Sequence, residues 1–393
     1  MTETLIIRYF GPIEDVTLDL SKINVFIGDQ GTGKSTVAKV ITAIELVKTE
    51  LANNDKNTID NTHINSINKV TKSLDDIFTD CLIYVGISNY LYDNTEITFD
   101  NEFFIFSYKN KEVTLNQKGN EVFDFNNAKY GIKSFIPANR ESAQLLGNDL
   151  FSLMKTRIQL PYLLTDFGEV LKRAKSVSEI FDFKEVLGVQ YEYKNEEDFF
   201  IIDNNKKISK IEASSALNSC LPMLLVYNYS MPYWKNQLEK YVWSQEILKK
   251  AYLIIIEEPE LNCFPETQKK VVQFFMGSLN SYNSVFNDNH KYPTSLIVTT
   301  HSPYILTSLN NLMYAYQVGQ THKTEVSKIV PEKYWVNPDD VRCYLMEKED
   351  YKLIMNEEDG LIDASYIDDV SNNLNNHYLR INEIKLKNEL GVI

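Results

Sequence analysis

Gly28-Asp29-Gln30-Gly31-Thr32-Gly33-Lys34-Ser35 matches the pattern G-x-x-x-x-G-K-[ST], which is typical of a phosphate-binding loop. The apolar run Ile23 to Ile27 precedes this loop with the composition of a strand, and Thr36 to Leu46 follows it with the spacing of a helix. A strand before the loop and a helix after it are the context that the pattern requires, so a Gly-rich turn matched by chance is a poor explanation. The sequence therefore predicts an α/β fold built on a P-loop.

The chemistry of a P-loop assigns a role to each part of this stretch. Glycines allow the tight turn that points backbone N–H groups and the helix N-terminus at phosphate oxygens. Lys34 is expected to reach the β and γ oxygens, as a catalytic residue, and Ser35 is expected to bind Mg²⁺. ATP and Mg²⁺ are thus the predicted cofactors. The predicted nucleotide-binding residues of the loop are Gly28, Asp29, Gln30, Gly31, Thr32, Gly33, Lys34, Ser35 and Thr36.

A second predicted strand ends in carboxylates. The run from Ala251 to Ile256 is almost wholly apolar and leads directly into Glu257-Glu258-Pro259-Glu260. In a P-loop sheet, such a strand brings its carboxylates to the edge that holds Mg²⁺. We expect Glu257 to serve the metal, and Glu258 to orient the water that attacks the γ-phosphate or to accept its proton. The alternative is a buried strand that ends in a solvated acidic turn, and the upstream P-loop makes it the weaker interpretation.

One of the five histidines follows a third apolar strand. The segment Thr300 to Pro303 contains His301 and comes directly after the strand Ser295 to Thr299, while a helical stretch from Thr267 to about Leu279 precedes that strand. This alternation indicates a parallel sheet, whose strands end at a common edge. His301 is therefore expected beside Glu258, as a catalytic contact to the γ-phosphate that distinguishes ATP from ADP. A lone histidine in such a place is otherwise structural.

Four segments together resemble the ABC-type ATPase superfamily that includes SMC, RecF and OLD proteins. They are Phe10 to Ile13, the P-loop, Glu257 to Glu260 and Thr300 to Pro303, and the likeness spans about residues 1 to 310. Within this superfamily, the short form without long arms resembles the ATPases of bacterial anti-phage systems, including the ATPase subunit of PARIS-type systems. The resemblance implies a P-loop NTPase of ABC type that hydrolyses ATP and forms a homodimer or higher homo-oligomer, in which two protomers sandwich the nucleotide.

In that family a signature segment of one protomer closes over the ATP of the other. Glu212 to Leu217 occupies the corresponding place here, so the resemblance makes Ser214 and Ser215 nucleotide contacts across the dimer. Ala216 stands where the family usually has Gly, and its methyl group is expected to loosen the contact and slow turnover. An ordinary serine N-cap is the alternative reading of this segment.

Two further segments depart from the family pattern. Pro137 to Glu141 lies where the Q-loop belongs but has no central glutamine, which leaves Asn139 and Arg140 as its candidate nucleotide contacts. Glu257 stands where the family commonly has Asp, a longer arm that should still reach the metal through water. Asn262 to Gln268 resembles the D-loop region, which the family places at the dimer seam.

The resemblance and the patterns together suggest how the chain is organised. We expect an ATPase head over residues 1–310, made of a first lobe (about 1–140), a helical lobe with the signature segment (about 141–240) and a part with the carboxylates and His301 (about 241–310). A C-terminal α+β extension, residues 311–393, is expected to pack on this head. The other predicted elements are strands at Leu5 to Ile7 and Val16 to Leu20, a mobile connection from Asn53 to Asn68, antiparallel hairpins of a side sheet from Ile97 to about Phe135, a helical region from about Leu145 to Leu187, a hairpin from Tyr191 to Ile202, a helix with Leu217, Leu221, Leu224 and Leu225 on one face, and a terminal helix from about Ile367 to Leu390.

Composition limits the cellular setting and the partners. The 54 acidic and 40 basic side chains give a formal charge of −14, which repels nucleic acid unless the basic residues gather on one face. Apolar runs are far shorter than the roughly 20 residues of a membrane span, and the N-terminus lacks a secretion signal, so a cytoplasmic protein is expected. The scatter of the four cysteines, Cys81, Cys220, Cys263 and Cys343, argues against a zinc site and against a disulfide framework, and Cys263 belongs either to the dimer seam or to the core.

The leading functional hypothesis is an ATP-gated sensor that controls a separate toxic effector, a nuclease or another toxin, in an anti-phage defence system, with a phage-derived trigger. About 70 residues separate Arg140 from Ser214, which is too few for the long coiled coil of an SMC-like tether. The region after His301 is too short for the nuclease domain of OLD proteins. The alternative is a RecF-like repair ATPase that clamps DNA, and a transporter subunit is a third, weaker possibility.

Overall fold

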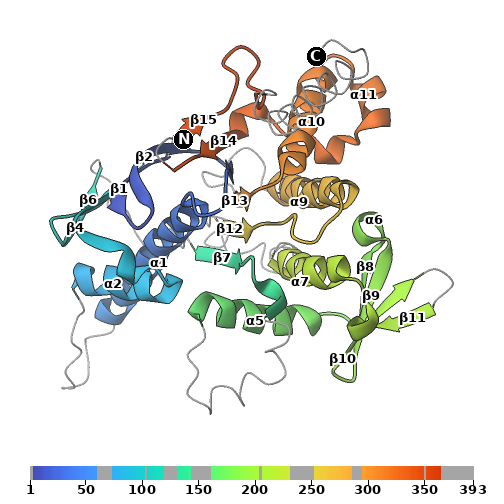
Figure 1. The fold of residues 1–393 in the computed structure, drawn as a ribbon, viewed down its shortest axis with the longest axis horizontal. Coiled ribbons are helices and arrows are strands. Elements are labelled where there is room, and N and C mark those ends of the chain that lie inside the picture. Colours follow the sequence, from blue (N-terminus) through green and yellow to red (C-terminus); the bar gives the residue numbers. More distant parts are fainter. Residues whose placement is uncertain are drawn as a thin grey trace, which may run out of the picture.

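A six-stranded sheet forms the centre of the molecule, in the order β15-β14-β3-β13-β12-β7 (Figure 1). Five strands are parallel, from β14 to β7, and β15 is antiparallel to β14. The computed structural model describes residues 3–59, 73–101, 104–118, 131–142, 161–202, 206–230, 252–285, 294–348 and 351–363. The strands of the sheet are β3 (Ile23–Ile27), β7 (Gly131–Ile136), β12 (Tyr252–Glu257), β13 (Ser295–Thr300), β14 (Val341–Met346) and β15 (Tyr351–Leu353).

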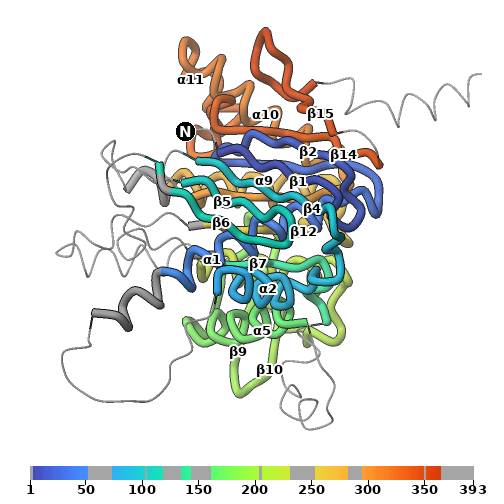
Figure 2. The backbone as a smooth tube through the Cα atoms, turned by 90° about the vertical axis from the view of Figure 1, so that its left-hand side faces the viewer, coloured from blue at the N-terminus to red at the C-terminus, as the bar shows by residue number. Residues whose placement is uncertain are grey.

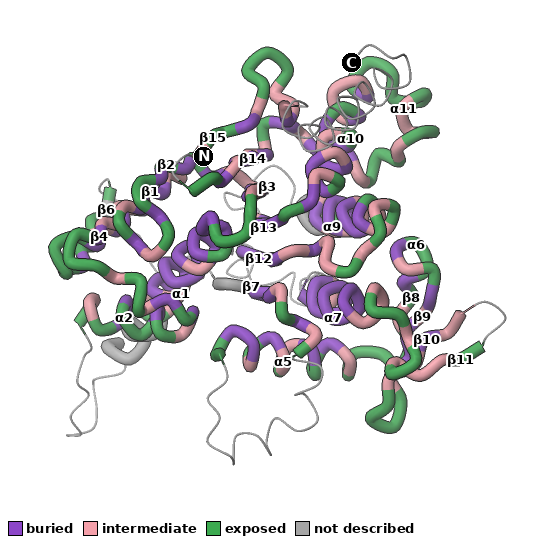
Figure 3. Tube along the Cα trace, viewed as in Figure 1, coloured by how far each residue is buried: buried purple, intermediate pink, exposed green. Residues whose placement is uncertain are grey.

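Helices cover both faces of this sheet, which explains why β12 and β13 are continuous apolar runs rather than alternating ones. On one face, Val25, Ile254 and Val298 pack into a core with α7 (Ser215–Ser230), α9 (Pro265–Val285) and α10 (Pro303–Gly319). On the other face, Phe26, Ile255 and Ile297 pack into a second core with α1 (Lys34–Ile59). Figure 3 shows the buried residues concentrated in the central strands and in the helices beside them.

An antiparallel side sheet completes the second core, in the order β2-β1-β4-β5-β6 (Figure 2). Asn110 and Lys111, both with positive φ, form the tight turn between β5 and β6 that the sequence predicts. Helix α2 packs on this sheet and begins with a capping box between Ser73 and Asp76. The bounds are β1 (Glu3–Phe10), β2 (Ile13–Leu20), β4 (Leu91–Asp100), β5 (Phe104–Lys109), β6 (Glu112–Gln117) and α2 (Leu74–Val85), with the short 3₁₀ helix η1 (Ser88–Tyr90) before β4.

The second lobe combines helices with a small antiparallel sheet, in the order β11-β10-β9-β8. Its apolar side chains join the first core, where Tyr191 and Phe200 are fully buried. Helix α7 crosses from this lobe to the central sheet and so ties the two together. The elements are α5 (Tyr162–Lys175), β8 (Ile180–Phe183), α6 (Lys184–Leu187), β9 (Val189–Lys194), β10 (Glu197–Ile202), β11 (Lys206–Ser209) and the 3₁₀ turn η3 (Lys210–Glu212).

The residues after position 310 contribute to the central sheet itself. The expected boundary at residue 310 falls inside α10, and β14 pairs with β3 along its whole length. Between these elements lie α11 (Lys323–Ile329) and two 3₁₀ turns, η5 (Glu332–Tyr334) and η6 (Pro338–Asp340). Among the helices that the structure describes, none combines the length and the apolar character needed to cross a bilayer.

The fold class predicted from the sequence is confirmed: an α/β fold with a largely parallel central sheet, an antiparallel side sheet and a second lobe rich in helix. Three expectations need correction. β7 belongs to the central parallel sheet rather than to the side sheet. Helix α1 continues to Ile59, so only residues 60–68 of the expected connection, like the expected terminal helix, lie outside the described residues.

The third correction concerns the cysteines. Cys220 on α7 and Cys263 after β12 are joined by a disulfide, while Cys81 and Cys343 are buried. The two paired residues are 43 positions apart in the chain, and no spacing pattern marks them. The packing of α7 beside the segment that follows β12 brings them together.

Candidate nucleotide-binding site

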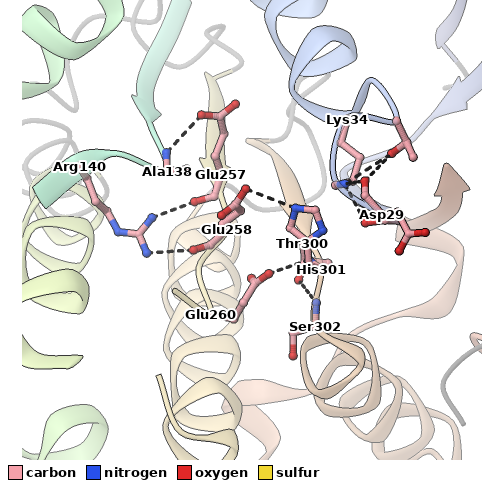
Figure 4. A network of polar contacts seen from close by, with 12 residues as sticks. Asp29, Lys34, Ala138, Arg140, Glu257, Glu258, Glu260, Thr300, His301 and Ser302 are labelled. Atoms are coloured by element: carbon pink, nitrogen blue, oxygen red, sulfur yellow. Dashed lines mark hydrogen bonds and ion pairs between the residues drawn. The ribbon is translucent and has the colours of Figure 1, made fainter. Parts of the chain in front are cut away.

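The candidate site residues follow the ends of four neighbouring parallel strands. In the sheet order β3-β13-β12-β7, the P-loop follows β3, His301 follows β13, Glu258 follows β12, and the segment Ala138 to Arg140 follows β7. Because carboxyl ends of parallel strands share one edge, segments that are far apart in the sequence meet there. Figure 4 shows the contacts of Lys34 within the P-loop and, beside them, the polar contacts among Arg140, Glu257, Glu258, Glu260 and His301.

The P-loop wraps around the ammonium group of Lys34. Its Nζ donates to the carbonyl oxygens of Gly28, at 2.8 Å, and Asp29, at 2.6 Å. The side chain is buried, and burial is the main reason why its pKa is lowered, although the negative charges of Glu258 and Asp29 act in the opposite direction. The Thr32 hydroxyl also donates to the Asp29 carbonyl, at 2.9 Å, which closes the turn. The loop therefore holds the Lys34 side chain within the electrostatic influence of Glu258 and Glu260, at the end of β12.

Two glycines of the loop are required by its geometry. A Cβ atom on Gly28 would lie 2.0 Å from the carbonyl oxygen of Met346 on β14, and Gly31 adopts a φ of 81° that side chains disfavour. The C-terminal part of the chain also contacts the loop through Tyr351, whose hydroxyl donates to the Thr32 carbonyl at 3.4 Å. The motif thus depends on strands that come more than 300 residues later in the sequence.

Glu257 ends β12 as a buried carboxylate. Its Oε2 accepts a hydrogen bond from the backbone N–H of Ala138, at 3.2 Å, while Oε1 is buried and has no hydrogen-bond partner among the described residues. Burial raises the pKa of Glu257, and the nearby hydroxyl of Ser35 and ammonium of Lys39 lower it in part. A buried carboxylate oxygen without a partner, next to the P-loop serine, fits a water-mediated ligand of Mg²⁺. Ser35 and Glu257 are therefore the residues that would hold the metal.

Glu258 occupies the turn directly after β12. Its backbone is left-handed, with a φ of 47°, and its N–H donates to the carbonyl of Thr299 on β13 at 2.8 Å. This turn directs the carboxylate toward β13, where Oε1 lies 3.4 Å from Nε2 of His301 (Figure 4). Both side chains are partly exposed, so the pair is accessible to a water molecule and a phosphate group.

Glu260 holds the backbone of His301 in place. Its Oε1 accepts a hydrogen bond from the backbone N–H of His301 at 2.6 Å, and burial raises the pKa of this carboxyl group. Ser302, the next residue, begins α10 as its N-cap and donates to the side chain of Gln268 on α9, at 2.6 Å. Glu260 belongs to the carboxylate segment of the sequence, but the sequence alone indicated no role for it. Its position shortly after a strand that ends at the site could have indicated that Glu260 also lies there.

Arg140 does not have the role that the sequence suggested. Its side chain is fully buried, and its guanidinium donates to the backbone carbonyls of Glu257, Glu258 and Ser219, at 2.9, 2.9 and 3.0 Å. Burial lowers the pKa of Arg140 to about 10, while the surrounding glutamates act against this, so the group stays charged at neutral pH. The expected contact between Arg140 and the nucleotide is incorrect, because the guanidinium is turned into the protein. Asn139, its neighbour, is exposed and keeps its place as a candidate contact.

The signature candidates lie exposed at the N-terminal end of α7. Ser215 is the first residue of the helix, and the Ser214 hydroxyl accepts from the N–H of Leu217 at 3.4 Å, which is the geometry of an N-cap. Within one chain, the contacts described for these two serines are local. The resemblance implies that a nucleotide held by a second copy of the chain would contact these serines.

The sheet order, the P-loop after β3 and the carboxylates after β12 define the class of protein: a P-loop ATP-binding protein with an α/β fold. Residues 163–306 match the family model described as an AAA ATPase domain. This segment begins after the P-loop and contains Ser214, Glu258 and His301. No curated protein matches the chain.

Several solved structures of SMC head domains are similar, at low sequence identity. An SMC head bound to the C-terminal winged-helix domain of ScpA shares 11% identity, with a TM-score of 0.40 over 90% of this chain and 97% of the other. The SMC head domain from Thermotoga maritima shares 11% identity, with a TM-score of 0.35 over 78% and 91%. An SMC head with an extended coiled coil, bound to the C-terminal domain of ScpA from Pyrococcus furiosus, shares 13% identity, with a TM-score of 0.37 over 90% and 95%. These similarities are weak, and the class rests on the site and the strand order.

Proposed function

We propose that this protein hydrolyses ATP to ADP and phosphate, with Glu258 as the residue that activates water. The observation that carries the proposal is the pair of Glu258 and His301, 3.4 Å apart at the ends of adjacent strands, beside the P-loop. A carboxylate at this place accepts a proton from water as the water oxygen bonds to the γ-phosphorus. The bond between the γ-phosphorus and its bridging oxygen breaks in the same step.

Each remaining residue of the site has a defined task in this proposal. Lys34 exchanges its carbonyl partners for the β and γ oxygens and offsets their negative charge. Ser35 and Glu257 hold Mg²⁺, which supplies charge neutralisation for the phosphates when it is bound. His301 contacts the γ-phosphate and so distinguishes ATP from ADP. Asn139, exposed in the segment after β7, is a candidate contact to the nucleotide.

We further propose that two copies of the chain close around two ATP molecules. The exposed position of Ser214 and Ser215 at a helix N-terminus supports this, because such an end binds phosphate oxygens. Ala216 in this segment favours slow turnover and hence a long-lived closed state. A slow cycle suits a switch better than a motor.

The biological role we propose is control of a separate toxic effector in an anti-phage defence system, in the cytoplasm. Support comes from the segment between Arg140 and Ser214, which in its described part folds into α5 and the compact β8–β11 sheet rather than into two long arms. A short-armed head of this kind is suited to hold a partner protein near the ATP site. The net charge of −14 makes duplex DNA a less favoured partner.

The test is mass spectrometry of proteins that co-purify with the tagged Glu258→Gln variant from its native host in the presence of ATP. The variant should hold the closed dimer and retain a nuclease or toxin in a fixed ratio, and the Lys34→Ala variant should lose that partner. Recovery of nuclease-sensitive DNA without a protein partner would instead favour the RecF-like repair function. Salt-sensitive DNA binding that requires ATP would support the same conclusion.

A further inference from the structure

Arg140 is a charged side chain with no exposed surface, and it lies between α7 and the turn after β12 (Figure 4). Its Nη1 donates to the Glu257 carbonyl and its Nη2 to the Glu258 carbonyl, both at 2.9 Å. Its Nε donates in a third direction, to the carbonyl of Ser219 on α7, at 3.0 Å. A buried guanidinium is stable only if its donors are paired, and here the Pro137 carbonyl, 3.4 Å from Nη1, is a fourth backbone acceptor.

The two carbonyl groups at the end of β12 lie on either side of the α-carbon of Glu258. The Glu257 carbonyl belongs to the peptide group before that atom, and the Glu258 carbonyl belongs to the peptide group after it. One planar guanidinium therefore holds the peptide groups on both sides of Glu258. Glu258 is one of the few residues other than glycine with positive φ, a conformation that persists only when its surroundings impose it.

The position of the Glu258 side chain follows from this backbone conformation. A relaxed backbone at Glu258 would turn its Cβ away from β13 and separate the carboxylate from His301. The backbone N–H of Glu258 is held independently, by the Thr299 carbonyl at 2.8 Å. Arg140 and Thr299 together thus fix the direction in which the Cα–Cβ bond of Glu258 leaves the backbone.

We infer that Arg140 is a positioning residue for the proposed hydrolysis: it holds the left-handed turn at Glu258 and anchors that turn to the signature helix α7. This inference rests on the proposed function of Glu258. It assigns no contact between Arg140 and substrate. It predicts that the arginine affects the rate of the chemical step more than the affinity for ATP.

Arg140→Lys is the decisive variant, because an ammonium group keeps the charge but cannot hold two carbonyls in one plane. We expect kcat for ATP to fall about 10- to 100-fold, the range typical of residues that orient a catalytic group, while the Kd for ATP changes less than about twofold. In the Glu258→Gln background the same change should cause no further fall in kcat, because the positioned carboxylate is already absent. Arg140→Gln should behave like Arg140→Lys or worse.

Lys175→Gln is the matched control. Lys175 is a partly buried cation of the second lobe, paired with Asp198 at 2.8 Å, and makes no described contact with the site. Its removal should leave kcat unchanged even if it lowers the melting temperature. An Arg140→Lys protein with wild-type kcat, or one whose only defect is weaker ATP binding, would overturn the inference.

Two results separate this inference from the proposed function. If the wild-type protein does not hydrolyse ATP, or if Glu258→Gln is as active as wild type, the proposed function fails first.

If neither Arg140 variant folds, NMR of the wild-type protein labelled with ¹⁵N-arginine replaces them, which is practical because the chain has six arginines. The Arg140 Nε–H should exchange slowly and shift when a non-hydrolysable ATP analogue binds with Mg²⁺. Exchange as fast as that of the exposed Arg173, or no shift on binding, would contradict the inference.

Discussion

Nε2 of His301 lies 3.4 Å from Oε1 of Glu258, although the two residues are 43 positions apart in the chain and follow different strands. The contact exists because β12 and β13 are adjacent and parallel, with Glu257 in register with Thr299. Each residue leaves its strand at the same edge of the sheet. Glu260 then fixes the backbone of His301 from the other side.

The first prediction concerns Glu258. Replacing it with Gln keeps the size of the side chain but removes the proton acceptor, so kcat for ATP hydrolysis should fall about 10²- to 10⁴-fold. ATP binding should persist, because the P-loop is unchanged. Phosphate release under multiple turnover and equilibrium binding of a fluorescent ATP analogue measure the two quantities. Unchanged turnover would remove Glu258 from its assigned role.

His301 is expected to matter for the discrimination of nucleotides. Without the imidazole, His301→Ala should bind ADP as wild type does but lose its preference for ATP, and kcat should fall about 10²-fold. Isothermal titration with ADP and with a non-hydrolysable ATP analogue compares the two affinities. His322 on the surface near α11 offers a control, and His322→Ala should be silent. An equal loss of affinity for both nucleotides would show that His301 has a structural role.

The third prediction compares two glycines of the P-loop. Gly28→Ala places a methyl group against the Met346 carbonyl, 2.0 Å away, and should destabilise the fold by about 1–3 kcal/mol or more through displacement of β14. Gly31→Ala meets no atom within 4 Å, so it carries only the strain of its φ of 81°, about 1–2 kcal/mol. Urea unfolding measures both. A Gly31→Ala protein less stable than Gly28→Ala would contradict the close approach of β14 to the loop.

The fourth prediction uses the raised pKa of Glu257. Because burial raises this pKa, the contribution of Glu257 to stability is fully present below the ordinary carboxyl value of about 4.3 and is lost as the pH rises through the raised value. Glu257→Gln should therefore raise the melting temperature at pH 7.5, and the gain should shrink as the pH approaches 4.

The same variant should lose the stabilisation that Mg²⁺ adds to ATP binding, because an amide is a poorer metal ligand than a carboxylate. Thermal unfolding with ATP alone, with Mg²⁺ alone and with both separates the two effects. A Glu257→Gln protein that is less stable than wild type at neutral pH, and still responds to Mg²⁺ with ATP, would contradict both parts of the prediction.

Much of the site follows from the sequence alone. The P-loop, the carboxylates after β12 and His301 are each short, contiguous patterns next to an apolar strand, and parallel strands place such patterns at one edge whatever the rest of the fold does. For the same reason the α/β class and the side-sheet turn at Asn110 and Lys111 are predictable. These features depend on residues that are neighbours in the chain.

Other features arise only when distant segments pack together. From the sequence alone, Arg140 is a candidate contact to the nucleotide in a loop. Only the packing of α7 and of the turn at Glu258 around it makes Arg140 a buried side chain that binds backbone carbonyls. In the sequence, Gly28 is an ordinary glycine of the P-loop motif. In the structure, β14 from the far end of the sequence lies against it and leaves no room for a side chain. Local patterns determine which chemical groups reach the edge of the sheet. Long-range packing decides which of them face the nucleotide and which hold the others in place, because burial and hydrogen-bond partners are properties of the assembled core.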